Sequence, residues 1–317
     1  MHLSRRQITV AAACAGLSIH PVVFGASGVI RMVTPTPPGA AADVMARILA
    51  EHMAQSLGQT IVVENKPGAS GVIAVEAVLQ SDPATMTLLV AGLDHIIYGP
   101  ATMGRKPWNP LTDVAPIGLV NADRWVIVGN PASAGSWQAM VDTARQRPLR
   151  CANAGLGTTQ HGVCAWFAKR TGVQAEHIPY SQSFMPDLMA GRVDIAAMPL
   201  PGAAAPLASG RLRGVALLSA VRHPSFPAIP TAAEMGQSGL VFEAGLAMYT
   251  RAGAAEALVE RLHLALQKAQ SDDKVKARFA DLGIETVVVE RSRVRTVLQE
   301  RIALNEAIRA EAFGIAR

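Results

Sequence analysis

Three features are scarce in this 317-residue chain, and each scarcity excludes a class of protein. Charged residues make up 17% of the chain against 50% apolar residues, which excludes an intrinsically disordered protein. No stretch approaches the run of about 20 apolar residues that a transmembrane helix needs. Aromatic residues amount to 4% and never interleave with a basic run, so no nucleic-acid partner is predicted. The length suits two hydrophobic cores better than one.

Residues 1–27 have the pattern of a signal peptide. Arg5 and Arg6 precede an apolar stretch over residues 8–19, and small residues at 25–28 mark the expected cleavage region. The mature protein is therefore expected in the periplasm. The adjacent arginines leave both the general secretory route and the twin-arginine route open. Cleavage removes two arginines and no acidic residue, which lowers the formal net charge from +5 to +3.

Cysteine is also scarce, with three residues in the whole chain. Cys14 lies in the apolar stretch of the signal peptide, so the exported chain keeps Cys151 and Cys164. Export permits a disulfide between them. Because one lies in an expected strand and the other in the next helix, buried free thiols are the favoured expectation. No Cys-x-x-Cys or His-Glu-x-x-His spacing occurs, so no metal site and no cofactor are predicted.

Apolar runs of strand length alternate with stretches of helical spacing almost throughout the chain. Residues 29–33 read as a strand and residues 43–57 as a helix, and this alternation predicts an α/β fold with largely parallel sheets. No repeat or low-complexity linker separates the halves, which favours a boundary crossed by strands. We expect a discontinuous first domain, 28–124 with 234–317, and a second domain, 125–233.

Two loops share one design, in which a strand ends in small residues and glycine and a helix follows. They are TPTPPGAAAD at 34–43 and NAGLGTTQHG at 153–162. A helix N-terminus presents unpaired N–H groups and about half a positive charge, which favours a bound anion. Two such ends facing each other would hold a small carboxylate where strand-to-helix turns converge. Each loop is also compatible with an ordinary turn in which Asp43, Thr158 or Thr159 caps its own helix.

The first of these loops lies in the stretch RMVTPTPPGAAADVMARILAEHMAQSLGQTIVVENKPGASGVIAVEAV, which contains Pro-x-Pro-Pro-Gly and Glu-Asn-x-Pro-Gly-Ala. With CANAGLGTTQHGVCAWFAKRTGV, HIPY, MAGRVDIAAMP and ADLGIE, it resembles the substrate-binding (Bug/TctC-like) family of tripartite tricarboxylate transporters over nearly the whole mature chain. The resemblance implies a two-domain α/β fold of the type II periplasmic-binding (Venus-flytrap) class. Each domain would be a mixed sheet flanked by helices, and the two would close on a small organic anion or amino acid.

The resemblance also implies a set of ligand-binding residues, to which we add Tyr180 as a candidate for the cleft wall. Several positions depart from the family pattern: Thr36 replaces an aromatic residue, Ala40 a glycine and Gln160 a serine. The scaffold is kept while the pocket wall differs, so ligand identity does not follow from the resemblance. The predicted ligand-binding residues are Thr36, Pro38, Gly39, Ala40, Ala41, Asp43, Gly157, Thr158, Thr159, Gln160, His161 and Tyr180.

Three functions are weighed. The leading one is a monomeric extracytoplasmic solute-binding protein that passes a carboxylate ligand to the membrane subunits of a tripartite carboxylate transporter. The second is a sensor of the same fold that signals to a membrane kinase. The third is a periplasmic enzyme with His161 as general base. It is disfavoured because no Gly-x-Ser-x-Gly elbow occurs and Gln160 stands where a dinucleotide fingerprint needs glycine, so no catalytic residue is predicted.

Overall fold

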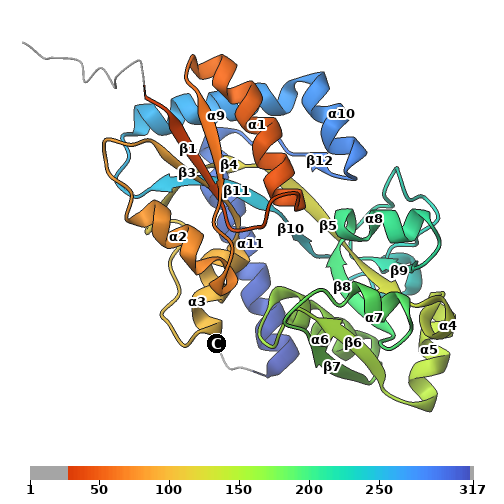
Figure 1. Cartoon of the computed structure of the whole chain (residues 1–317). Coiled ribbons are helices and arrows are strands. Elements are labelled where there is room, and N and C mark those ends of the chain that lie inside the picture. The colour runs from red at the N-terminus through yellow and green to blue at the C-terminus, as the bar shows by residue number, and fades with distance from the viewer. Residues whose placement is uncertain (1–27, 315–317) are drawn as a thin grey trace, which may run out of the picture.

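A computed structural model describes residues 28–314, so the expected signal peptide lies outside the described residues. The described chain forms two α/β lobes, each built on its own sheet, and strands cross between them (Figure 1). Within residues 28–314, no helix combines the length and the apolar character that crossing a bilayer requires.

The first lobe has a five-stranded sheet with the order β2-β1-β3-β11-β4. Its strands are β1 (Ile30–Thr34), β2 (Ile61–Asn65), β3 (Thr87–Gly92), β4 (Val114–Leu119) and β11 (Leu246–Arg251). Its helices are α1 (Ala41–Leu57), α2 (Val72–Leu79), α3 (Gly99–Thr102), α9 (Glu256–Ser271) and α10 (Asp273–Asp281), with short turns η1 (Ala69–Gly71) and η2 (Asp94–Tyr98). Strands β1, β2 and β3 are parallel, and β11 runs antiparallel to β3 and β4.

The alternation of side chains along β3 explains why this sheet is covered on both faces. Leu88 and Val90 pack in the core formed with α1 and α9. Leu89 and Ala91 pack in the opposite core, formed with α2. All six residues of β3 are buried, and Leu88 to Ala91 form a continuous apolar run rather than an alternating one, as expected for a strand with both faces covered.

The second lobe has a sheet with the order β10-β5-β8-β6-β7, and β9 and β12 also pair with β5. Its strands are β5 (Asn121–Gly129), β6 (Leu149–Asn153), β7 (Ala175–Pro179), β8 (Ile195–Pro199), β9 (Arg213–Leu217), β10 (Glu243–Ala244) and β12 (Glu285–Thr286). Its helices are α4 (Pro131–Ala134), α5 (Trp137–Gln146), α6 (Thr159–Thr171), α7 (Met185–Met189) and α8 (Leu200–Ala208), with the turn η3 (Ala233–Met235). Along β5, Ile127 packs in the core with α5 and α6, while Val126 and Val128 pack in the core with α7 and α8.

The two cysteines of the second lobe correct the expectation of free thiols. Cys151 of β6 and Cys164 of α6 are both fully buried and joined in a disulfide. The strand and the helix that follows it pack against each other, which brings the two side chains together in one core. Closing a loop of 13 residues restricts the unfolded chain and so stabilises the second lobe.

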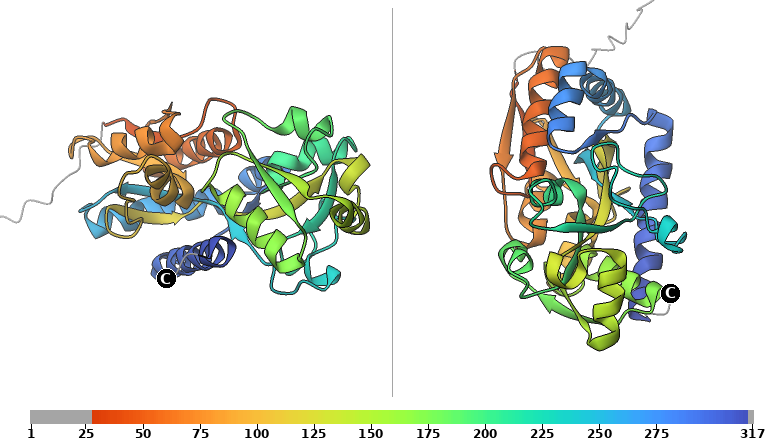
Figure 2. Two further views of the ribbon diagram at one scale, coloured as in Figure 1. Left: turned by 90° about the horizontal axis from the view of Figure 1, so that it is seen from below. Right: turned by 90° about the vertical axis from the view of Figure 1, so that its right-hand side faces the viewer.

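Three segments join the lobes. In β5, residues 121–124 pair with β10 and β12, and residues 125–129 pair with β8 and β9. The chain returns through β10 into β11, and the last helix, α11 (Arg291–Phe313), runs alongside both lobes (Figure 2). The predicted boundary at 234 assigns Leu240 and Phe242 to the first domain. In the structure, both residues pack in the second-lobe core formed with α5 and α6.

Gly245 lies at the return crossing, between β10 and β11. Its φ is 147°, and a Cβ added there would collide with the backbone carbonyl oxygen of Asn121. Asn121 is fully buried and its Oδ1 accepts a 2.8 Å hydrogen bond from the Leu246 N–H, so little room exists for movement. The two crossing strands therefore require glycine at this position.

We expect Gly245→Ala to lower the free energy of unfolding by about 2 kcal/mol, because it combines an unfavourable φ with a backbone clash. The matched control is Gly253→Ala. Gly253 also has a positive φ, 76°, but a Cβ there meets nothing within 4 Å, so only about 1 kcal/mol should be lost. Urea unfolding followed by circular dichroism measures both variants. Equal losses would show that the clash at the crossing has no energetic effect.

Candidate functional site

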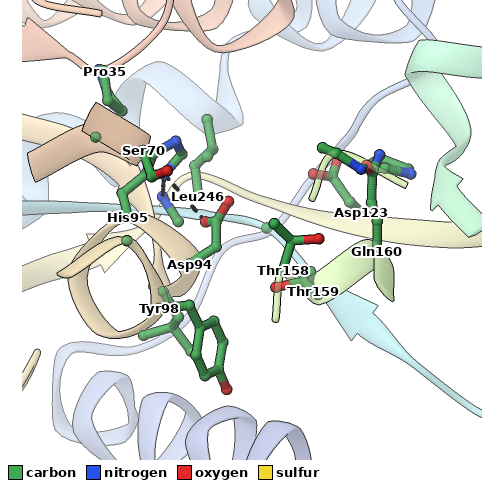
Figure 3. A pocket seen from close by; sticks show the side chains of 18 of the residues that line it. Pro35, Ser70, Asp94, His95, Tyr98, Asp123, Thr158, Thr159, Gln160 and Leu246 are labelled. Atoms are coloured by element: carbon green, nitrogen blue, oxygen red, sulfur yellow. Dashed lines mark hydrogen bonds and ion pairs between the residues drawn. The ribbon is translucent and has the colours of Figure 1, made fainter. Parts of the chain in front are cut away.

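A cavity of about 590 Å³ lies between the lobes, beside the crossing strands. The first lobe lines it with loops after β1, β2 and β3, and the second lobe lines it with the loop and first turn of α6 (Figure 3). The segments that join the lobes supply Asp123, residues 243–246 and Arg301. Because both lobes and their junction contribute, the cavity has the position of a ligand cleft in a two-domain binding protein.

The N-terminus of α6 forms the second-lobe wall, and Thr158, Thr159 and Gln160 all line the cavity there. Thr158 is the N-cap: its hydroxyl oxygen accepts a 3.3 Å hydrogen bond from the His161 N–H, and the hydroxyl donates to the Gly155 carbonyl at 2.7 Å. The first turn of a helix leaves N–H groups unpaired within the helix. These three predicted residues therefore lie where an anion would be stabilised by the helix dipole.

The loop before α1 has a different arrangement. Pro35 and Pro37 line the cavity, whereas none of the six residues predicted here does so. Helix α1 begins at Ala41, and the buried Asp43 lies in its first turn instead of capping it. The Asp43 carboxylate accepts 2.8 Å hydrogen bonds from the Gly39 N–H and the Asn65 side-chain amide and forms an ion pair with Arg47. The six predicted residues outside the cavity lining are Thr36, Pro38, Gly39, Ala40, Ala41 and Asp43.

Asp43 thus occupies the anion position at the start of α1. Burial alone would raise the pKa of Asp43, but the hydrogen bonds and the Arg47 guanidinium outweigh it, so the pKa is lowered and the carboxylate stays ionised. Its negative charge already balances the helix N-terminus. The structure brings Asp43 together with Gly39, Asn65 and Arg47 rather than with the cleft.

The remaining predicted residues, Gly157, His161 and Tyr180, also lie outside the cavity lining. The Gly157 N–H donates to His161 Nδ1 at 3.0 Å, and the Tyr180 hydroxyl donates to Asp187 at 2.9 Å. The His161 ring packs against the rings of His177 and Phe313. Burial, with smaller effects of neighbouring charges, lowers the pKa of His161 to about 4, so the ring is neutral at pH 7. Its role in the structure is to support the loop behind the cleft wall.

The loop between β2 and α2 also lines the cleft, with Pro67, Gly68, Ser70 and Gly71, none of which is among the predicted ligand-binding residues. Gly68, Ala69, Ser70 and Gly71 all have positive φ, at 115°, 48°, 51° and 91°. Non-glycine residues with positive φ are uncommon and store strain that often occurs at ligand sites. A Cβ on Gly71 would overlap the ring of His95. The sequence signal was the Pro-Gly-Ala-Ser-Gly run, whose two glycines permit this close approach.

Next to this loop, Asp94 and His95 begin the π-helical turn η2. Such turns occur frequently at functional sites. His95 Nδ1 lies 3.1 Å from an Asp94 carboxylate oxygen. Burial alone would raise the pKa of Asp94 and lower that of His95, but their mutual attraction outweighs it. The net result is a lowered pKa for Asp94 and a raised pKa for His95, so the pair favours its charged form.

Comparisons with known proteins agree with this architecture. Residues 45–313 match the family described as the tripartite tricarboxylate transporter family receptor. Protein BugT of Bordetella pertussis is 33% identical over 279 residues, which cover 86% of each chain. Among solved structures, Rpa4515 of R. palustris with adipate superimposes with a TM-score of 0.79 and 25% identity over 92% of this chain and 98% of that one. The periplasmic binding protein BugD superimposes with a TM-score of 0.75 and 27% identity over 89% and 97% of the two chains.

These matches confirm the resemblance and the two-domain periplasmic-binding fold predicted from the sequence. The matched family is one of receptors. The matched region contains the α6 N-terminus, the crossing strands and the whole of α11. This chain belongs to the tripartite tricarboxylate transporter receptor family.

Proposed function

We propose that this protein is a periplasmic solute-binding protein that captures a small carboxylate-bearing ligand between its lobes and delivers it to the membrane subunits of a tripartite transporter. The observation that carries the proposal is the α6 N-terminus, which faces the inter-lobe cavity through Thr158, Thr159 and Gln160. The periplasmic location is supported by BugD, a periplasmic binding protein of similar fold and sequence. Carboxylate binding is supported by Rpa4515, whose structure contains adipate.

The binding energy in this proposal comes from N–H and hydroxyl donors aimed at carboxylate oxygens. Hydrogen bonds to an ionised acceptor are roughly twice as strong as those between neutral groups. Closure of the lobes excludes water, which strengthens every electrostatic interaction inside the cleft. Among the twelve residues predicted from the sequence, we assign ligand contact to the three that line the cavity, and support of the loops to the others.

A catalytic role for His161 has no geometric support. Its Nδ1 accepts a hydrogen bond from the Gly157 N–H, and the residue does not line the cavity. A general base has to reach its substrate within about 3 Å or through one water. We therefore retain binding without chemistry as the proposed activity.

A thermal-shift screen tests the proposal with mono-, di- and tricarboxylates, aromatic acids and amino acids. A ligand at 100 times its dissociation constant adds about 2.7 kcal/mol of stability. For a protein of this size, that corresponds to a rise in melting temperature of roughly 5 °C. The matched control for each hit is its methyl ester or amide, which lacks the charge and should give no shift. The absence of any shift across the acids would contradict the proposed function.

A further inference from the structure

The charge of the cleft lining differs from what a receptor for simple anions requires. The lining includes three carboxylates, from Asp94, Asp123 and Glu243, against the guanidinium of Arg301 and the imidazole of His95. Since His95 already pairs with Asp94, two carboxylates remain against one guanidinium. A ligand that carries only negative charge would enter a cleft with an excess of the same charge.

Asp123 is the more buried of these two remaining carboxylates, because Glu243 is exposed. It lies on β5 at the point where this strand passes from one lobe to the other. One carboxylate oxygen accepts a 2.6 Å hydrogen bond from the Asn121 side-chain amide, and within residues 28–314 no Lys, Arg or His nitrogen lies within 4.0 Å of it. Burial, with a smaller contribution from Asp94, raises the pKa of Asp123 to about 6, although Arg301 and Asn121 act in the opposite direction. The positive charge of Arg301 therefore does not fully compensate the negative charge of Asp123.

Asp123 lies close enough to the α6 N-terminus for its negative charge to act on a ligand bound there. Figure 3 shows Asp94 on one side of the cleft and Asp123, Thr158 and Gln160 on the other. A ligand held by its carboxylate at Thr158 and Thr159 would therefore bring its remaining groups to these two acidic side chains. The cleft thus offers hydrogen-bond donors at the α6 N-terminus and carboxylates on both of its sides, so it suits a ligand that carries a positive group besides its carboxylate.

The Coulomb energy indicates how strongly the cleft discriminates. Charges interact more strongly in a partly buried cleft than in bulk water, because the effective dielectric constant is lower. A second ligand carboxylate near Asp123 is therefore repelled, and an ammonium group at the same place is attracted. Sites that hold a polar ligand group in a buried position reject analogues that lack it by large factors.

We propose that Asp123 is a specificity-determining residue, and that it selects ligands that carry an ammonium group in addition to a carboxylate. This inference rests on the proposed function, because it assumes that the ligand carboxylate binds at the α6 N-terminus. The ammonium group lies between Asp123 and Asp94 and so contacts the crossing strand and the first-lobe wall at once. Dicarboxylates without an amino group are poor ligands for the same reason.

Matched pairs of ligands test this selectivity on the unmodified protein. The pairs are adipate and 2-aminoadipate, glutarate and glutamate, succinate and aspartate, and hexanoate and 6-aminohexanoate, measured by isothermal titration calorimetry at pH 7.5. In at least one pair, the amino-bearing member should bind at least tenfold more tightly. Equal or tighter binding of the members without the amino group would overturn the selectivity and leave the proposed function standing. Binding by no member of any pair, together with no shift for any acid in the thermal-shift screen, would overturn both.

A charge-removing variant tests the assignment to Asp123. Asp123→Asn keeps the side-chain volume, and we expect it to reduce the preference for the amino-bearing member at least tenfold. The control is Asp281→Asn, which removes an exposed carboxylate at the end of α10 and should leave the preference unchanged. The melting temperature of each variant verifies folding. An unchanged preference in folded Asp123→Asn would overturn the assignment.

Discussion

Replacing Thr158 with glutamate should weaken ligand binding at least 100-fold. Thr158 caps α6 and lines the cleft, so the new carboxylate would lie where we place the carboxylate of the ligand. Two like charges about 4 Å apart repel by about 4 kcal/mol at an effective dielectric constant of 20, which exceeds the 2.7 kcal/mol of a 100-fold loss. Isothermal titration calorimetry with the best acid from the thermal-shift screen measures the change.

Folding should be nearly unaffected in the same variant. Loss of the threonine cap costs about 1 kcal/mol, but a negative charge at a helix N-terminus recovers part of this. Thr158→Ser keeps the hydroxyl and serves as the control, with affinity expected within about threefold of the unmodified protein. Normal binding by Thr158→Glu would mean that the carboxylate does not bind at the α6 N-terminus.

Replacing Asp194 with alanine should lower the free energy of unfolding by about 3 kcal/mol. The Asp194 carboxylate is fully buried just before β8. It accepts 2.7 Å and 2.9 Å hydrogen bonds from the Arg147 guanidinium, and a 2.8 Å hydrogen bond from the Arg150 backbone N–H. Removing it leaves this N–H without an acceptor and breaks a partly buried ion-pair network.

The control for Asp194→Ala is Asp142→Ala, which removes an exposed ion pair of the same lobe. Asp142 pairs with Arg145 at 3.1 Å, and these side chains are 49% and 72% exposed. Asp142→Ala should therefore cost less than about 1 kcal/mol. Urea unfolding gives both values, and similar losses in the two variants would contradict the importance of the buried network.

Asp194 also predicts how stability depends on pH. Burial would raise the pKa of Asp194, but the hydrogen bonds from Arg147 and Arg150 outweigh it and hold the pKa well below its ordinary value. A depressed native pKa contributes stability above the unfolded pKa, which is about 3.9, and this stability is lost as the pH falls. The difference in the free energy of unfolding between the unmodified protein and Asp194→Ala should therefore shrink steadily as the pH falls from about 5 to about 2. A constant difference over this range would contradict the ionised state of Asp194.

Much of the fold follows from local sequence patterns. The apolar run at 29–33 predicted β1, and the helical spacing at 43–57 predicted α1, because each of these signals lies within one element. The strand β4 and the first half of β5 were missed. Their residues lie where the chain passes between lobes, so their burial depends on partners from residues 243–251 and 285–286.

The site residues could likewise be predicted where the sequence signal is local, and not where it depends on distant residues. The α6 N-terminus was found because its glycines and threonines are adjacent in the sequence. The start of α1 has the same local pattern, but Asn65, 22 residues away from Asp43, helps to hold that carboxylate inside the loop. Asp123 and Arg301 are 178 positions apart and belong to no motif. Only the crossing of the chain brings them to one cavity.

Helix α11 couples the stability of the two lobes. Val294 and Leu298 of α11 are fully buried members of a first-lobe core, and Ile308 is a buried member of a second-lobe core. Detachment of this one helix would therefore expose apolar surface in both lobes at once. Neither lobe can keep its native interior while the other loses contact with α11, so the two are expected to unfold together.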